Sequence, residues 1–440
     1  MSKHISHSIR GLWLALGIAA CSPDRLLDVR DIDVLDPSTL NTKGALPTLL
    51  AGSLSAFQIA YSGAGDLSNG GHEGMVNMSG LLADEFIHAE TFPDRQSVDI
   101  RNIAAGNGSV KGVFFDLAQA RALSDLTSAR YNTFDQGVDG HSEVLSLSAF
   151  AYVMFAENFC SGVPFSTLTD DGVDFGQPQT RDEILAIALA KFDSALTFAT
   201  TNQNDELAHL ARVGRGRVLL NQGNHAQAAA AVSAVPTNFV YAIEGSANSA
   251  RQNNGIWNYT VNFFGFSVPD REGTNGLPWR SANDPRVPWV NTGEVGFDGE
   301  TPYFMQQKYP DKESETILAS GIEARLIEAE AALQGGNSGL AFQTLNALRQ
   351  SAGLGTLATP GTATAREDAL FRERAFWLYL TAHRLGDMRR LVRQYGRSQE
   401  AVFPVGSYHK GGEYGSDVNF PVSSDERNNP NFESCLDRNA

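Results

Sequence analysis

Apolar residues recur every three or four positions through much of this chain, which is the spacing of an amphipathic α-helix. The first such run covers residues 45–61, where leucines and aromatic rings share one face. Similar runs cover residues 111–130 and 141–160, and the latter is followed by Gly162 and Pro164, residue types that commonly end a helix. The pattern predicts a fold that is mainly all-α.

A weak internal repeat lies in the middle of the chain. Residues 220–224, Leu-Asn-Gln-Gly-Asn, are followed by Ala228, and residues 333–337, Leu-Gln-Gly-Gly-Asn, are followed by Ala341. Each copy has the pattern of helix, tight turn and helix, and residues 182–200 add a preceding helix to the first copy. Small residues at these positions favour a tetratricopeptide-like helical-repeat scaffold. A generic antiparallel helix pair with a glycine stop explains the repeat equally well.

Two segments lose the helical period. Residues 236–315 are rich in Asn, Gly, Ser, Pro and aromatic residues, and the tail from about 402 to 440 is similarly irregular. Long irregular connections on a helical scaffold often carry function. We therefore expect an N-terminal helical part over 37–235, a loop-rich ligand-side insertion over 236–315, and C-terminal helices with an irregular tail over 316–440.

The N-terminus has the pattern of a lipoprotein signal peptide. Lys3 and Arg10 precede an apolar stretch that closes with Ala-Ala before Cys21. This stretch is too short to cross a bilayer as a helix. We expect cleavage after residues 1–20, a lipidated Cys21, and a polar tether over 22–36 that leads into the folded body. An ordinary secretory signal or a buried helix start are the alternatives.

The charge balance argues against a nucleic-acid partner. The chain has 34 basic and 50 acidic side chains, a net charge of -16, and no concentrated run of Lys and Arg. Phosphate binding needs such a cationic face. After residue 21 no apolar run approaches the length of a membrane span, so we expect attachment to the membrane through the lipid anchor alone.

Two cysteines remain once Cys21 is assigned to a lipid. Cys160 and Cys435 are expected to meet oxidising conditions in an exported protein. A disulfide between them is plausible. Two separate buried thiols are the alternative.

Motifs of catalysis, metal binding and cofactor binding are missing from the sequence. Asp84 and Glu85 are adjacent, so their side chains diverge and cannot flank one glycosidic bond from both sides. We expect them to be structural or to hydrogen-bond a ligand. Two further acidic groups lack the pattern of a calcium loop and are interpreted as solvated loops: Asp31, Asp33 and Asp36, and Asp170, Asp171 and Asp174.

Aromatic residues cluster within the irregular insertion. Trp257 and Tyr259 flank Asn258, and further rings follow at Phe263, Phe264, Phe266, Trp279 and Trp289. Rings in irregular segments can form platforms for the apolar faces of sugars, while Asn and Arg side chains hydrogen-bond the hydroxyls. The alternative is that these rings pack the loops onto the helices. The candidate ligand-binding residues are Trp257, Asn258, Tyr259, Phe264 and Trp279.

The chain resembles, in order along its length, the SusD/RagB family of nutrient-uptake outer-membrane lipoproteins, which includes starch-binding SusD-like proteins. The C-terminal region carries the most specific match. Thr381-Ala382 departs from the Glu-Gly that this family usually has there, and Leu385 replaces a bulkier residue. The matching segments are Leu26–Val29, Leu50–Phe57, Leu82–Phe86, Phe150–Pro164, Asn283–Arg286, Ile322–Leu354, Glu373-Arg374, His383-Arg384, Asp387, Arg389-Arg390, Phe420–Val422 and Asn429–Phe432.

Charged residues of this C-terminal match lie beside a strongly apolar helical pattern that includes Phe371, Phe376 and Trp377. Buried charges on such a helix must be paired. We therefore predict structural ion pairs and no catalytic role for Glu373, Arg374, Arg384, Asp387 and Arg389.

The resemblance implies a function that the residues alone do not specify. Family members bind glycans or peptides at the cell surface and act as the lid of a SusC-like TonB-dependent outer-membrane transporter. For this chain it implies a non-enzymatic lipoprotein of the outer membrane, with no cofactor or metal. A tetratricopeptide-type envelope adaptor and, less favoured, a polysaccharide-cleaving lipoprotein are the alternatives.

Overall fold

The structure is a computed structural model that describes residues 40–65, 72–169 and 172–440. The predicted signal peptide over 1–20, the lipidation at Cys21 and the tether over 22–36 lie outside the described residues. The same holds for Asp31, Asp33, Asp36, Asp170 and Asp171.

The three helices predicted first are present. α1 spans Leu46–Ser62 after a short 3-10 turn, η3 (Lys43–Ala45), α4 spans Gly108–Phe134 and α5 spans Asp139–Asn158. Because α5 lies between neighbours on several sides, most of its side chains are buried, serines included. Two shorter helices between α1 and α4 lack a clear sequence period: α2 (Met75–Leu82) and α3 (Pro93–Asp99).

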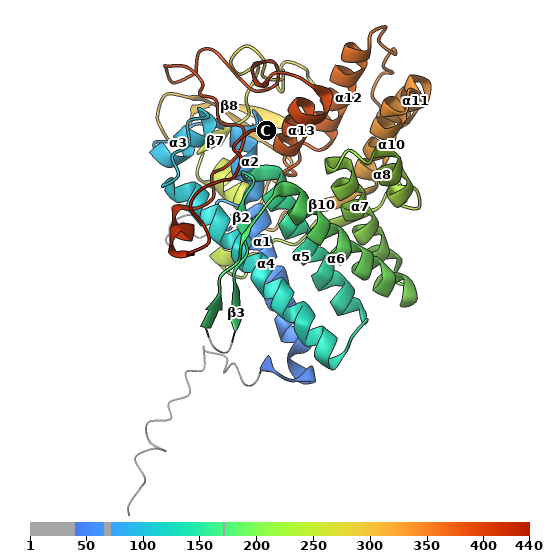
Figure 1. Cartoon of the computed structure of the whole chain (residues 1–440). Coiled ribbons are helices and arrows are strands. Elements are labelled where there is room, and N and C mark those ends of the chain that lie inside the picture. The colour runs from blue at the N-terminus through green and yellow to red at the C-terminus, as the bar shows by residue number, and fades with distance from the viewer. Residues whose placement is uncertain (1–39, 66–71, 170–171) are drawn as a thin grey trace, which may run out of the picture. The chain divides into compact units, whose positions relative to one another are not determined.

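Helices α4 to α8, α10 and α11 pack one against the next, while α1 packs against α4 (Figure 1). Such a succession of antiparallel neighbours is the arrangement of a tetratricopeptide-like scaffold. The helical-repeat interpretation is therefore confirmed. The later helices of the row are α6 (Arg181–Thr201), α7 (Asp205–Asn221), α8 (His225–Val232), α10 (Gly321–Gln334) and α11 (Ser338–Ser351).

Three turns in this row share one geometry. Gln203, Gly223 and Gly336 each have a positive φ, of 59°, 77° and 79°. In each turn the following asparagine donates its backbone N–H to the carbonyl five residues earlier, at 2.8–2.9 Å. This bond satisfies a carbonyl left open at the helix end. The sequence repeat therefore marks two of three equivalent turns, and Gln203 occupies the third.

Glycines within α7 let the helices approach closely. A Cβ atom at Gly214 would lie 2.2 Å from the ring of Phe192 on α6, and one at Gly216 would lie 2.4 Å from Val232 on α8. Since real Cβ atoms do not come so close, α7 can hold its two neighbours only with glycine at these positions.

Among the described residues, only α6 has the length and hydropathy of a membrane-spanning helix. Its apolar residues Ile184, Leu185 and Phe192 are buried, and the helix packs between α5 and α7. Lys191 and Asp193 interrupt its surface. These contacts show that α6 packs one apolar face into the scaffold.

The insertion over 236–315 is irregular for most of its length, yet it contains short elements. It also supplies strands to antiparallel two-stranded sheets. Strand β6 (Val240–Ile243) pairs with β10 (Thr316–Ser320), β8 (Trp289–Val295) with β9 (Pro302–Gln306), and β7 (Phe266–Ser267) with β1 (Ile87–His88). Its helical turns are η4 (Ala250–Gln252), α9 (Gly255–Trp257) and the π-helix η5 (Asn258–Asn262).

Two further sheets follow α5. Strand β2 (Val163–Pro164) pairs with β5 (Pro178–Gln179), and β3 (Thr167–Thr169) pairs with β4 (Gly172–Asp174).

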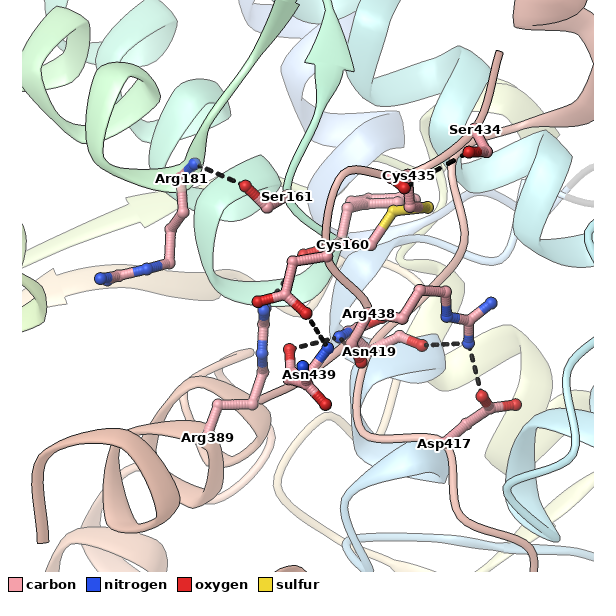
Figure 2. Close-up of a disulfide and its surroundings, with 12 residues drawn as sticks. Cys160, Ser161, Arg181, Arg389, Asp417, Asn419, Ser434, Cys435, Arg438 and Asn439 are labelled. Atoms are coloured by element: carbon pink, nitrogen blue, oxygen red, sulfur yellow. Dashed lines mark hydrogen bonds and ion pairs between the residues drawn. A yellow bond between two sulfur atoms is a disulfide. The ribbon is translucent and has the colours of Figure 1, made fainter. Parts of the chain in front are cut away.

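The C-terminal region contains α12 (Ala363–Trp377), α13 (Arg384–Tyr395), α14 (Gln399–Val402) and the 3-10 turn η6 (Ser424–Asn428), with irregular chain after α14. A disulfide joins Cys160, at the end of α5, to Cys435 in the tail, with a Cα–Cα distance of 5.9 Å (Figure 2). Asn419 adds hydrogen bonds to the carbonyl oxygens of Arg438 and Asn439. The tail is therefore fixed onto α5, and the predicted disulfide is confirmed.

Most of the predicted charged residues form buried ion pairs. Arg374 donates two hydrogen bonds to Asp387, at 2.7 and 2.9 Å, and Arg390 pairs with both Asp387 and Glu330. Burial would raise the pKa of Asp387, but the two arginines outweigh it and hold that pKa below its usual range. This cluster ties α12 and α13 to α10.

Glu373 and Arg384 belong to separate pairs. Glu373 accepts from Arg286 at 2.6 Å and from Arg349 at 2.7 Å, whereas Arg384 pairs with Asp84 at 3.0 Å. The carboxylate of Asp84 also accepts the backbone N–H of Leu277 at 2.9 Å. Asp84 is therefore structural, which is one of the two roles expected for it from the sequence.

The prediction of an ion pair for Arg389 is wrong. Its guanidinium donates to the carbonyl oxygens of Ala156, Glu157 and Phe159 at the end of α5, beside the disulfide (Figure 2). No carboxylate lies within ion-pair distance of it in the described part of the chain. Carbonyls at a helix C-terminus carry partial negative charge and lack partners, so they replace the expected carboxylate.

Candidate functional site

Phenylalanines from three distant segments lie close together at the surface. The ring of Phe263 contacts those of Phe92 and Phe297, and Phe264 follows Phe263 in the chain and is hydrogen-bonded through its carbonyl to Phe297. These four residues are called here the phenylalanine patch. Phe92, Phe264 and Phe297 are 48%, 46% and 53% exposed, and Phe263 is half-buried among them. Ring centroids are 6.4 Å apart for Phe92 and Phe263 and 4.5 Å apart for Phe263 and Phe297. Phenylalanine side chains are usually buried, so this much exposed aromatic surface in one small area is unusual.

Local backbone structure presents these rings. Phe92 is the N-cap of α3, where Pro93 starts the helix. Phe263 follows η5 and donates its N–H to the carbonyl of Asn258 at 2.9 Å. Phe264 has a φ of +55°, a left-handed conformation that is rare for a bulky residue. Strained residues and π-helical turns are both frequent at functional sites.

Backbone hydrogen bonds fasten the three segments together. Phe297 donates to the carbonyl of Phe264 at 3.1 Å, Asp298 donates to Ala89 at 3.1 Å, and Ala89 donates to Gly265 at 2.7 Å. A Cβ atom at Gly296 would lie 2.4 Å from the carbonyl oxygen of Ala89. The turn between β8 and β9 can therefore reach β1 only with glycine at position 296.

The carboxylate of Asp298 holds this turn in shape. It accepts from the backbone N–H groups of Glu300 and Thr301 and from the Thr301 hydroxyl. It also forms an ion pair of 2.5 Å with Lys410 of the tail. Burial would raise the pKa of Asp298, but these partners, Lys410 first, hold that pKa well below its usual range. Asp298 is therefore ionised, and the positive charge of Lys410 compensates its negative charge.

A buried guanidinium lies under the patch. Arg95 donates to both carboxylate oxygens of Glu90, at 2.7 and 2.8 Å, and to Glu73 at 3.1 Å. Its Cζ atom is 4.5 Å from the ring centre of Phe92 and 4.7 Å from that of Tyr259. Burial raises the pKa of Glu90 to about 7, even though Arg95 opposes this change. The cation–π contacts fix the Phe92 ring from below.

Three of the predicted ligand-binding residues lie inside the protein, contrary to expectation. Tyr259 is fully buried and stacks on Phe266, with ring centres 5.3 Å apart. Asn258 is 1% exposed, and Trp279 is fully buried against Phe376 and Tyr379. Burial of such large rings is strongly favourable, and it makes them supports of the loops rather than open platforms.

The other two predicted residues reach the surface. Phe264 belongs to the patch and packs edge-on against Tyr303, with ring centres 5.4 Å apart. Trp257, at the end of α9, is half-buried. Sequence reasoning missed Phe92 and Phe297. Phe297 directly precedes Asp298-Gly299, a turn dipeptide, and this was the one sequence signal that its ring would be exposed.

The patch has the properties of a binding surface. Phenylalanine faces can stack on the apolar face of a sugar ring or on apolar protein surface. Within the described ranges, no group of three or more His, Cys, Asp or Glu side chains could hold a metal ion.

Solved structures with the same fold come from Bacteroides. A SusD-like protein from Bacteroides fragilis aligns with a TM-score of 0.63 at 14% identity, covering 91% of this chain and 98% of its own. A SusD-like carbohydrate-binding protein from the same species gives 0.67 at 14%, covering 90% and 100%. The surface glycan-binding protein A of Bacteroides uniformis gives 0.68 at 13%, covering 90% and 99%.

These alignments establish that the chain has the SusD-like fold over nearly its whole described length. The sequence matches no protein-family model and no curated protein. At 11–15% identity the shared fold does not identify a ligand.

Proposed function

We propose that this protein is a member of the SusD/RagB family: a nutrient-binding lipoprotein of the outer membrane, exposed at the cell surface, without catalytic activity. Its ligand would be a glycan or oligosaccharide, or in second place a peptide. It would act as the lid of a SusC-like TonB-dependent transporter, anchored through Cys21.

The observation that carries the glycan assignment is the phenylalanine patch. Four rings from segments far apart in sequence are held in place by backbone hydrogen bonds, a strained Phe264 and the Asp298–Lys410 ion pair. Structure of this kind around exposed apolar rings stabilises a preformed surface, which lowers the entropic cost of ligand binding. The names of the solved relatives, which refer to glycan and carbohydrate binding, agree with this choice.

Ligand capture by the patch can be tested with two variants and a matched control. Phe92→Ala and Phe297→Ala each remove one exposed ring, and Phe115→Ala removes a ring that is 64% exposed on α4, outside the patch. Native gels cast with different polysaccharides would be run with all four proteins. Retarded migration of the parent and of Phe115→Ala, with loss of retardation in both patch variants, supports the proposal. Equal behaviour of all four proteins on a retarding polysaccharide contradicts it.

The transporter partnership needs a separate experiment. The tagged full chain would be purified from gently solubilised membranes, and proteins recovered in comparable amount would be identified by mass spectrometry. A large TonB-dependent barrel supports the lid model. Recovery of envelope-assembly proteins without a barrel supports the adaptor alternative, in which the patch would bind protein.

Absence of catalysis is also open to measurement. Incubation with each retarding polysaccharide should release no new reducing ends. If new reducing ends appear, and the activity remains with this protein after purification to homogeneity, the polysaccharide-cleaving alternative is established.

A further inference from the structure

Two buried carboxylates share one guanidinium beneath the phenylalanine patch. Glu73 and Glu90 are each 1% exposed. Both pair with Arg95, which donates from Nε to Glu73 at 3.1 Å and from Nη1 to the two carboxylate oxygens of Glu90 at 2.7 and 2.8 Å. One positive charge cannot balance two buried negative charges, and an excess buried charge is strongly unfavourable. This group of three side chains is therefore expected to take up a proton.

Glu90 is the carboxylate of this group that titrates near neutral pH. Burial raises the pKa of Glu90 to about 7 against the opposing effect of Arg95, and the negative charge of Glu73 contributes to the rise. Burial also raises the pKa of Glu73, again against Arg95. Near neutral pH, Glu90 therefore exchanges between a neutral and an ionised form.

Several neighbouring groups stay neutral in this pH range. His88 on β1 has its Nε2 atom 3.9 Å from Oε1 of Glu90, and burial, assisted by the charge of Lys410, lowers the pKa of His88 to about 3. Burial also lowers the pKa of His409 in the tail, which donates to the carbonyl oxygen of His88 at 3.0 Å. Burial raises the pKa of Tyr259 on η5 well above its usual range. These three groups do not account for a titration near pH 7.

Lys410 and Asp99 complete the charged surroundings of Glu90. Lys410 donates to the backbone carbonyl of Glu90 at 2.8 Å and forms the ion pair with Asp298. Asp99, at the end of α3, accepts the backbone N–H of His88 at 2.8 Å, and burial raises the pKa of Asp99 to about 7 as well. An experiment on Glu90 must therefore separate the two acids.

Arg95 links the charge state of Glu90 to the Phe92 ring. Its Cζ atom lies 4.5 Å from the centre of that ring, and the guanidinium is held at Nε by Glu73 and at Nη1 by Glu90. A proton on Glu90 removes the negative charge and one of the two acceptor oxygens, so the guanidinium is free to pivot about its bond to Glu73. A cation–π contact depends on the position of the cation over the ring. Protonation of Glu90 therefore removes the fixed support of Phe92.

Glu90 also adjoins the other segments of the patch. A Cβ atom at Gly265 would lie 3.4 Å from Cδ of Glu90, so the carboxyl group packs against the segment that follows η5. Lys410 links the backbone of Glu90 to Asp298 in the turn between β8 and β9. Glu90 therefore contacts, directly or through one side chain, the three segments that carry the rings.

We propose that Glu90 is a positioning residue that makes glycan binding by the phenylalanine patch depend on pH. Its ionised form holds Phe92, through Arg95, in the orientation that binds the ligand, and its protonated form releases the ring. The effect on binding rests on the proposed glycan ligand, whereas the response of the Phe92 ring to pH does not. Affinity should rise by about three- to tenfold between pH 6 and pH 8, because the ionised fraction of Glu90 increases about tenfold over that range.

A fluorine reporter tests the response of the ring without any ligand. 4-Trifluoromethylphenylalanine would be incorporated at position 92 of the full chain, and its ¹⁹F NMR signal would be followed from pH 5 to pH 9. The signal should titrate with a midpoint near pH 7, and it should become independent of pH in Glu90→Gln, which keeps an acceptor for Arg95. A signal that is constant in the labelled parent, or that titrates equally in Glu90→Gln, overturns the proposal.

Two control variants assign the titration. Asp99→Asn removes the other nearby acid, and Glu294→Gln removes an exposed carboxylate from β8. Both should keep the titration of the fluorine signal. Its loss in Asp99→Asn together with its persistence in Glu90→Gln would assign the effect to Asp99 and refute the role of Glu90.

Binding would be measured with an oligosaccharide prepared from a polysaccharide that retards the parent. Isothermal titration calorimetry should give a dissociation constant that is about three- to tenfold lower at pH 8 than at pH 6, for the parent and for Glu294→Gln. Glu90→Gln should bind equally at both pH values. Equal affinity of the parent at the two pH values, or an undiminished change in Glu90→Gln, contradicts the proposal.

The ring response and the glycan assignment fail independently. Titration of the fluorine signal without retardation by any polysaccharide would support the ring response and refute the glycan ligand. Retardation with a constant fluorine signal would support the glycan ligand and refute the positioning role of Glu90.

Discussion

The backbone N–H of Phe297 donates a hydrogen bond of 3.1 Å to the carbonyl oxygen of Phe264. The bond joins the turn between β8 and β9 to the chain that leaves η5. Each residue is about half exposed, so the bond fixes two accessible rings relative to each other. The Phe264 backbone is in a left-handed conformation at φ +55°, a strain that surrounding contacts must offset.

Gly296→Ala should disrupt this junction. The added Cβ would meet the Ala89 carbonyl oxygen at 2.4 Å, so the turn must move away from β1. We expect the free energy of unfolding to fall by about 1–3 kcal/mol, as for other overpacked sites. We also expect polysaccharides to retard the variant less than the parent protein in native gels. Urea denaturation and native gels measure the two effects. Gly355→Ala, which has nothing within 4 Å of the new Cβ, should leave both unchanged.

Gln203→Gly should stabilise the protein. Gln203 is exposed and holds φ +59° in a turn whose two equivalents contain Gly223 and Gly336. An L-residue in this conformation is disfavoured by about 1–2 kcal/mol, and the extra freedom of glycine in the unfolded chain offsets about 0.4–1 kcal/mol of the gain. The unfolding free energy should therefore rise by about 0.5–1 kcal/mol in urea denaturation. Gly223→Gln should lower it by a similar amount, and a fall in both variants would contradict the shared-turn geometry.

Loss of the Cys160–Cys435 disulfide should destabilise the whole fold. The bond closes a loop with a sequence separation of 275 residues, so it restricts the unfolded chain strongly. Replacing both cysteines with serine should lower the free energy of unfolding by about 2–4 kcal/mol. Thermal or urea unfolding with and without dithiothreitol measures this. Reductant should destabilise the parent protein and leave the double variant unaffected; an effect on both would point to another cause.

Glu85→Gln should change the pH dependence of stability. Glu85 accepts the N–H of Leu380 at 2.9 Å, and burial raises its pKa from 4.5 to about 8 in spite of that bond and of Arg384. The pKa of Glu85 is higher in the folded than in the unfolded protein. The contribution of Glu85 to the free energy of unfolding is therefore complete below the unfolded-state pKa and is lost as pH rises to about 8. Glutamine keeps the acceptor and cannot ionise.

The stability of Glu85→Gln relative to the parent should therefore rise between about pH 5 and pH 8, by up to about 1.4 kcal/mol per pH unit. Urea denaturation at several pH values measures the difference. Glu315→Gln, at an exposed position, should run parallel to the parent. A pH-independent difference for Glu85→Gln would mean that Glu85 is ionised in the folded protein throughout this range.

The sequence by itself determined the helical scaffold. The spacing of apolar residues located α1, α4, α5 and α6, and the repeated Gly-Asn pairs marked two turns, because helix periodicity and left-handed turns are local properties. The apolar setting of Arg374 and Asp387 likewise required a partner for each charge, since unpaired buried charge is too unfavourable to persist.

Only the tertiary structure decided which aromatic residues face solvent. Tyr259 and Trp279 have the same local signals as Phe264, yet Phe266 covers one and Phe376 with Tyr379 covers the other. Phe92 and Phe297 join Phe263 from distant segments through hydrogen bonds and close packing that leave no periodic trace in the sequence. In the same way, the guanidinium of Arg389 donates hydrogen bonds to carbonyl oxygens at the end of α5, where the sequence led us to expect a carboxylate. Exposure and partner choice depend on long-range contacts, and a local pattern cannot encode them.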